Sequence, residues 1–326
     1  MVENSARARV EKFVRMESPM PNFSIREERK KMDFHHDLAE ISSRGLKNLG
    51  IQISPNWDNW HLYMNWVQIR QRRLDSLQHY QVIYSQELTQ KLADLSENDK
   101  KNIADIENRL RNAEPITDYM SKLINSPSVE KSDFLLKAWN IYHLHLEKKN
   151  SKKKYTNPLL LFFQRKGNVV YFIDVRQHPY GNKWFSHELL EIVHDNWPEL
   201  VRYIPNMKPV LESGASVNLT DEQVFELMKN GVTTIVPFRD GSLLYTSGGI
   251  AASGDGGTAV FIADKVWNSL SLCQIRLNTN PQRYCNRTNN GAYRIPNYKL
   301  VLEDGSFFAY DKRRKEKLFL FKEPEI

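Results

Sequence analysis

Residues 159–178, LLLFFQRKGNVVYFIDVRQH, decide the fold. They contain two apolar runs, 159–164 and 169–175, separated by Gly167 and Asn168, a pair typical of a tight turn. Apolar runs of this length between turn residues are typical of buried β-strands. We therefore predict two strands that pair in antiparallel fashion across the turn.

Both flanks extend this pattern. On the N-terminal side, residues 139–146 (WNIYHLHL) alternate as a strand does, and Asn157 and Pro158 mark a turn before the next strand. On the C-terminal side, Ser186 can cap a helix over HELLEIVHDNW, which Pro198 ends. The predicted order is three antiparallel strands followed by a helix.

The remaining chain divides into a helical part before this sheet and a mixed part after it. Residues 60–94 have apolar side chains at helical spacing and predict one long helix or a pair, and no strand signal occurs before residue 130. After residue 213 we predict a capped helix from Thr220, a hairpin across Asp240 and Gly241, a helix near 259–272 and a C-terminal meander. The predicted fold class is α+β, with a helical domain at 1–130, a basic antiparallel-sheet domain at 131–212 and a C-terminal α+β module with hairpins at 213–326.

The composition is that of a folded protein. Of 326 residues, 40% are hydrophobic and 26% are charged. No apolar run approaches the roughly 18 residues that a membrane span needs, and the N-terminal residues lack the apolar core of a signal peptide. Cys273 and Cys285 are too few for a disulfide framework and are not spaced as a zinc site. We expect a cytoplasmic protein with no membrane span and no cofactor.

The net charge of +7 is concentrated in one part of the chain. Residues 131–185 carry 11 Lys or Arg and 3 Asp or Glu, a balance of +8, whereas residues 1–130 carry 19 of each. A concentrated positive charge favours a polyanionic partner, most often nucleic acid. The alternative is a solvated basic loop at residues 148–154. The candidate nucleic-acid-binding residues are Lys148, Lys149, Lys152, Lys153, Lys154, Arg165 and Lys166.

A pair of histidines two residues apart lies inside the basic region. Strand alternation places His143 and His145 on one face, opposite an apolar face formed by Tyr142, Leu144 and Leu146. The apolar face is expected to lie against a core, which leaves both imidazoles on the other side.

The third strand contributes further polar groups. Asp174, Arg176 and His178 share a face there, and Tyr180 and Lys183 follow. If the strands form one sheet, these groups can converge with the two histidines into a set suited to RNA cleavage without a metal. The candidate catalytic residues are His143, His145, His178, Arg176, Lys183 and Tyr180.

In that chemistry one imidazole takes the proton of a ribose 2′-OH and another protonates the leaving 5′-oxygen. Arg176 or Lys183 would stabilise the charge on the phosphate. Two alternatives stay open. The His-x-His pair has metal-ligand spacing, with His178 or His187 as a third ligand, or the histidines are structural.

These strands carry a family resemblance. WNIYHLHL, then LLLFFQRKGNVVYFIDVRQH, then a helix resemble the second half of a RelE/HigB-type toxin domain, over residues 134–196. The resemblance implies a small curved antiparallel sheet, cleavage of mRNA and an inhibitory protein partner. The long segments before and after the sheet depart from the compact single domain of that superfamily.

Two other features have weaker functional signals. The glycine-rich stretch 247–258 (SGGIAASGDGGT) lacks a following Gly-Lys-Ser/Thr, so we interpret it as a structural turn rather than a phosphate loop. The aromatic cluster in residues 56–66 (NWDNWHLYMNW) is typical of core packing. Arg70, Arg72 and Arg73 follow it, and we interpret them as a solvated helix face.

The sequence thus favours a metal-independent endoribonuclease that acts as a toxin or antiphage effector. A non-catalytic nucleic-acid-binding subunit of a defence complex is the first alternative, and a metal-dependent enzyme using the His-x-His pair is the second. The expected partners are RNA or another nucleic acid and an inhibitory or complex-forming protein.

Overall fold

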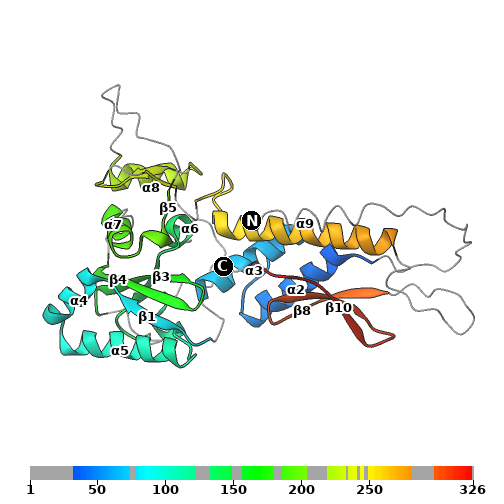
Figure 1. Ribbon diagram of the computed structural model, residues 1–326, viewed down its shortest axis with the longest axis horizontal. Helices are drawn as coiled ribbons and strands as arrows, with labels where there is room; N and C mark the ends of the chain where they lie inside the picture. The colour runs from blue at the N-terminus through cyan, green and yellow to red at the C-terminus, as the bar shows by residue number, and fades with distance from the viewer. Residues whose placement is uncertain are drawn as a thin grey trace, which may run out of the picture. The chain divides into compact units, whose positions relative to one another are not determined.

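The computed structural model confirms the α+β fold class (Figure 1). All the residues that the structure describes belong to one compact unit, Met32–Ile326. Described are residues 32–73, 78–121, 133–148, 156–178, 186–203, 219–232, 234–240, 243–245, 249–280 and 297–324.

The predicted three-stranded sheet is present and has a fourth strand. β2 (Tyr142–His145), β3 (Leu159–Lys166) and β4 (Val169–Gln177) pair in antiparallel fashion, as predicted. Gly167 takes a φ of +59° in the turn between β3 and β4, a conformation open to glycine at little cost. The fourth strand, β1 (Gln81–Tyr84), pairs in parallel with β4, so the strand order is β1-β4-β3-β2.

β1 shows that the prediction of an all-helical segment at residues 1–130 was wrong. The chain forms α3 (Asn59–Arg73), then β1, then α4 (Gln86–Lys91), where the apolar spacing predicts one long helix or a pair. Ser85 separates the strand from α4, because its hydroxyl accepts a hydrogen bond from Leu88 N and donates one to the Ile173 carbonyl of β4. A four-residue strand contains too few alternations to be recognised without its partner.

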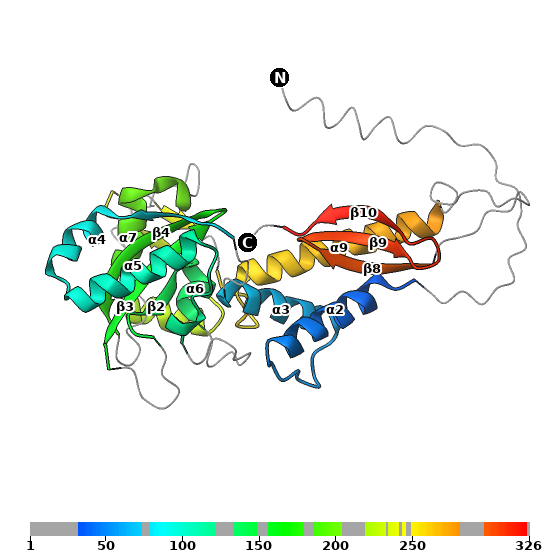
Figure 2. The same cartoon turned by 90° about the horizontal axis from the view of Figure 1, so that it is seen from below.

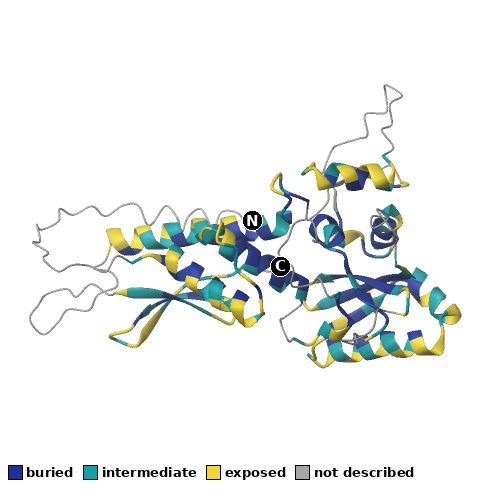
Figure 3. Ribbon diagram, turned by 180° about the vertical axis from the view of Figure 1, so that it is seen from behind, coloured by how far each residue is buried: buried dark blue, intermediate teal, exposed yellow. Residues whose placement is uncertain are grey.

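Helices cover both faces of this sheet (Figures 1 and 2). α4 and α5 (Glu97–Arg111) share one hydrophobic core with the sheet, and α6 (Phe134–Trp139), α7 (His187–Asn196) and α8 (Asp221–Lys229) share another. The predicted capping box of α8 is confirmed at Thr220. The sheet is therefore a buried layer for most of its width (Figure 3).

Short elements complete this part of the chain. β6 (Ile235–Pro237) and β7 (Leu243–Tyr245) form the predicted antiparallel hairpin. The short elements are the 3₁₀ turns Leu92–Asp94, Thr117–Tyr119 and Pro198–Leu200, and the small sheet β5 (Arg202–Tyr203), β7 (Leu243–Tyr245) and β6 (Ile235–Pro237), in that order.

A further core joins the N-terminal helices to the C-terminal hairpins. α2 (Phe34–Asn48), α3 and α9 (Gly257–Thr279) pack against the antiparallel sheet of β8 (Tyr298–Glu303), β9 (Ser306–Asp311) and β10 (Glu316–Lys322). The strand order is β10-β9-β8. The hydrophobic cores thus extend across both predicted boundaries, at residues 130 and 212.

The aromatic cluster of α3 packs in these cores, as predicted. Tyr63 is fully buried, and Trp66 lies so close to Gly45 of α2 that a β-carbon there would be 2.2 Å from the indole nitrogen. The interpretation of the arginines as a solvated face was wrong for two of them. Arg70 pairs with Glu323 through its two terminal nitrogens, Nη2 at 2.5 Å and Nη1 at 3.0 Å, and Arg72 is buried.

No helix among the described residues is long and apolar enough to cross a membrane.

Candidate functional site

The histidine pair lies on an edge strand of the four-stranded sheet. β2 is paired with β3 alone, and its alternation is as predicted: Tyr142 and Leu144 belong to the core on the α5 side. The strand is shorter than the predicted 139–146, because Asn140 ends α6 in a left-handed conformation with a φ of +55°. His143 and His145 therefore point to the face on which α6, α7 and α8 lie.

The structure brings His178 to the same place. His178 follows β4, and its backbone N–H is bonded to the carbonyl of Pro158, which extends the β3–β4 pairing by one step. Its ring stacks on that of His145, with centroids 5.8 Å apart and planes 27° apart. The ring of His143 lies 6.5 Å from that of His145. Three of the predicted catalytic residues thus form one histidine cluster, defined as His143, His145 and His178.

Asp133, which the sequence reasoning missed, completes the cluster. Its carboxylate caps α6 by accepting a hydrogen bond from Leu136 N at 3.1 Å, and its other oxygen lies 3.1 Å from Nδ1 of His143. The available signal was an aspartate immediately before the apolar run FLLKAW, which marks a helix start. Nothing local, however, connects this cap with an imidazole ten positions further on.

The pKa values of His143 and His145 are displaced in opposite directions. Burial alone would lower the pKa of His143, but the charge and hydrogen bond of the Asp133 carboxylate outweigh it, so the pKa is raised above 6.5. Burial, followed by the charges of the neighbouring His143 and His178, lowers the pKa of His145 to about 4. His143 thus holds its proton more tightly than a free imidazole does, and His145 holds its proton less tightly.

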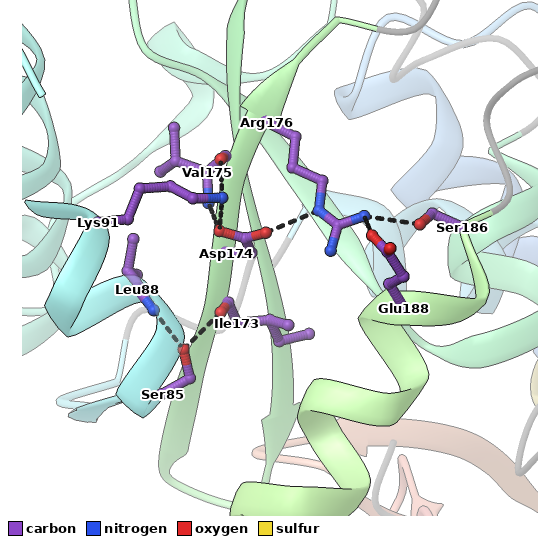
Figure 4. Close-up of polar contacts among 9 residues, drawn as sticks. All are labelled: Ser85, Leu88, Lys91, Ile173, Asp174, Val175, Arg176, Ser186 and Glu188. Atoms are coloured by element: carbon purple, nitrogen blue, oxygen red, sulfur yellow. Dashed lines mark hydrogen bonds and ion pairs between the residues drawn. The ribbon is translucent and has the colours of Figure 1, made fainter. Parts of the chain in front are cut away.

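Arg176 is bound by two carboxylates and a hydroxyl of the protein itself (Figure 4). Its Nε donates to Asp174 at 2.7 Å, and its Nη1 donates to Ser186 at 2.6 Å and to Glu188 at 2.9 Å. Asp174 is buried and also accepts from Lys91 at 2.6 Å. The two positive charges of Lys91 and Arg176 balance the two negative charges of Asp174 and Glu188. Arg176 would therefore have to leave its carboxylate partners before it could bind a phosphate.

The described basic residues do not form one patch. Lys148, near the end of β2, lies 3.0 Å from Asp105 of α5. Arg165 donates to the Tyr80 hydroxyl at 3.2 Å, and Lys166 donates to the Glu199 carbonyl at 2.9 Å. The last two lie at the opposite end of β3, about 20 Å along the strand at roughly 3.3 Å per residue. The remaining predicted site residues, Tyr180, Lys183, Lys149, Lys152, Lys153 and Lys154, lie outside the described residues.

The predicted metal-ligand set is not assembled in the parts of the chain that the structure describes. There, no group of three or more His, Cys, Asp or Glu side chains could hold a metal ion. The rings of His145 and His178 are stacked with their centroids 5.8 Å apart, and His187 lies on α7, 3.5 Å from Glu191.

The glycine-rich stretch supports α6, as expected of a structural turn. Within its described part, the Gly254 carbonyl accepts a hydrogen bond from the buried Nζ of Lys137 at 2.6 Å, and Gly249 N donates to the Ala138 carbonyl at 3.1 Å. Burial, with the nearby charge of Arg72, lowers the pKa of Lys137 to about 8. These bonds hold the helix whose cap, Asp133, pairs with His143.

No family model, no curated protein and no solved structure matches this chain, so the geometry itself carries the functional argument.

Proposed function

We propose that this protein is a metal-independent endoribonuclease whose acid–base groups are the histidine cluster. One arrangement carries the proposal: His143 lies 3.1 Å from the Asp133 carboxylate, which raises its pKa, and its ring lies 6.5 Å from the buried ring of His145, whose pKa is lowered to about 4. A pair of titratable groups separated in this way is the pattern of a general acid beside a general base.

In the proposed reaction, the neutral imidazole of His145 accepts the proton of a ribose 2′-OH while the 2′-oxygen attacks the phosphorus. The bond from phosphorus to the 5′-oxygen breaks, and the imidazolium of His143 gives its proton to that oxygen. The products are a 2′,3′-cyclic phosphate and a 5′-hydroxyl. Asp133 acts as a positioning residue that keeps His143 protonated. His178, partly exposed and stacked on His145, lies on the substrate side of the pair.

Two further observations are consistent with this function. The element order that carries the RelE/HigB resemblance, three antiparallel strands and then a helix, occurs as β2, β3, β4 and α7. Residues 131–185 have the positive charge that an RNA substrate requires. By the same resemblance we propose a toxin or antiphage role in the cytoplasm, restrained by a protein partner.

Burial of the cluster favours a second candidate. The side chain of His143 is 10% exposed, and His145 as a whole is 5% exposed, values typical of structural histidines. Arg176 is also occupied by carboxylates. In this candidate the protein is a non-catalytic nucleic-acid-binding subunit, and the cluster only ties β2 to α6.

Cleavage of end-labelled RNA in EDTA separates the two candidates. The wild type should release 2′,3′-cyclic phosphate ends, and His145→Gln should lower the rate by about 10²-fold or more, the usual contribution of general acid–base catalysis. His36→Ala is the matched control, because His36 lies on α2 with 63% of its side chain exposed, away from the cluster.

Binding without cleavage by the wild type would favour the subunit. Cleavage only after metal is restored would favour the metal-dependent alternative. Equal rates for wild type and His145→Gln would refute the proposed roles.

A further inference from the structure

The C-terminal sheet has one buried face and one open face. Leu300, Phe307 and Ala309 point inward and belong to the core with α2, α3 and α9. The outward positions alternate with these. At the β8 edge, Lys299 reaches α2 and pairs with Glu40 at 2.8 Å. No described helix covers the other outward positions, and in Figure 2 the three strands lie in front of α9. We call this surface, formed by Lys299, Val301, Glu303, Phe308, Tyr310, Lys317 and Phe319, the outer face.

Aromatic side chains occupy the middle of the outer face. Val301, Phe308 and Phe319 are directly paired across the three strands, and the rings of the two phenylalanines lie 5.8 Å apart. Phe319 is 54% exposed, although it is a large hydrophobic residue. Tyr310 lies two residues along β9 in the next row, between Lys299 and Lys317. Phe308 and Tyr310 are partly exposed, and an exposed phenylalanine beside such rings is a marker of a binding surface.

A run of four cations forms the turn beside this face. The turn between β9 and β10 has the sequence Lys312, Arg313, Arg314, Lys315. Arg314 is near Asp311, at 3.7 Å. Lys312, Arg313 and Lys315 are exposed, and among the described residues their side chains enter no ion pair. Three cations therefore remain available to an anionic partner.

We propose that the outer face and its basic turn bind single-stranded RNA. Exposed rings on a strand surface stack on bases of any sequence, and neighbouring cations neutralise the phosphates between those bases. A duplex keeps its base faces stacked internally and cannot use the rings. An apolar protein partner would use the rings but would oppose four consecutive positive charges. This binding site does not depend on cleavage at the histidine cluster.

The test measures binding of a labelled single-stranded 2′-O-methyl RNA of 12 nucleotides by fluorescence anisotropy in EDTA. The methyl group removes the attacking hydroxyl, so binding is measured whether or not the protein cleaves RNA. The logarithm of the association constant falls with the logarithm of the salt concentration, with a slope of roughly 0.7 per phosphate contact. Replacing Lys312, Arg313 and Lys315 with glutamine should therefore make this slope shallower by about 2. Phe319→Ala should weaken binding about 5-fold or more, from the loss of one stacked base.

A charge-matched variant provides the control. Lys47, Lys101 and Lys229 are exposed on three separate helices, and their replacement with glutamine removes the same net charge. This variant should keep the wild-type slope. Binding of a duplex of equal length should not respond to Phe319→Ala. Equal weakening by both triple variants, wild-type affinity in Phe319→Ala, or no RNA binding by the wild type would each overturn the proposal.

Discussion

Replacing Asp133 with asparagine tests the electrostatic coupling at the histidine cluster. Asparagine caps a helix about as well as aspartate, so α6 keeps its start and only the negative charge is lost. At the observed separation of 3.1 Å from His143, two unit charges attract by about 5 kcal/mol at an effective dielectric constant of 20. Burial of both groups opposes this attraction, and we expect a net loss of unfolding free energy of about 3 kcal/mol.

The loss should depend on pH in a defined direction. The folded-state pKa of His143 is raised, so its contribution is fully present below about 6.5 and disappears as the pH rises through the raised value. The pKa of Asp133 is lowered, because the ion pair with His143 outweighs its burial, so its contribution is present above about 4 and disappears in stronger acid. Asp133→Asn should therefore differ most from the wild type at pH 5 to 6, and less at pH 9.

Urea unfolding at pH 5.5 and pH 9 measures this difference. NMR titration of ¹³C-labelled histidine measures the pKa of His143 itself. It should lie above 6.5 in the wild type and below 6.5 in Asp133→Asn, where burial is no longer opposed. An unchanged pKa for His143, or a stability difference that does not vary with pH, would show that Asp133 does not control the protonation of His143.

Three further predictions concern stability. The pKa of His145 is lowered to about 4, so the stability that its neutral ring contributes is present above the pKa of the unfolded state and is lost as the pH falls. Urea unfolding should therefore show up to about 3 kcal/mol less stability at pH 4 than at pH 7. The difference between the two pH values should be smaller in His145→Gln. Gly45→Ala should lower the melting temperature, despite the better helix propensity of alanine, because the added β-carbon would lie 2.2 Å from the Trp66 indole; a rise would contradict this packing. Arg70→Ala leaves the largely buried Glu323 without its bidentate partner and should cost about 3 kcal/mol in urea unfolding, whereas the double variant with Glu323→Gln should recover part of that loss.

The two faces of β2 have different roles in the proposed site. The same strand that packs Tyr142 and Leu144 into one core presents two imidazoles to the other side. α6 is held by the glycine-rich stretch through Lys137, and its cap holds His143. A substitution that removes the Lys137 hydrogen bond should therefore change the pKa of His143 while leaving the pairing of the sheet intact.

Local sequence determined the elements whose signals are complete within a few residues. The period-two alternation of residues 142–145 predicted which side of β2 enters a core, because successive side chains of a strand point to opposite faces. Thr220 and Gln223 predicted the start of α8, because both partners of a capping box lie within one turn. The turn at Gly167 and the flanking apolar runs predicted the central hairpin, because both strands and their turn are contiguous in the sequence.

Tertiary structure alone decided which distant segments meet. β1 is too short to be recognised and becomes a strand only by parallel pairing with β4. The core shared by α2, α3, α9 and the C-terminal hairpins joins opposite ends of the described chain. The ion pairs that set the state of His143 and occupy Arg176 likewise depend on neighbours from other elements. A hydrogen bond or ion pair acts over a few ångströms in space, so its partners are defined only once the chain has folded.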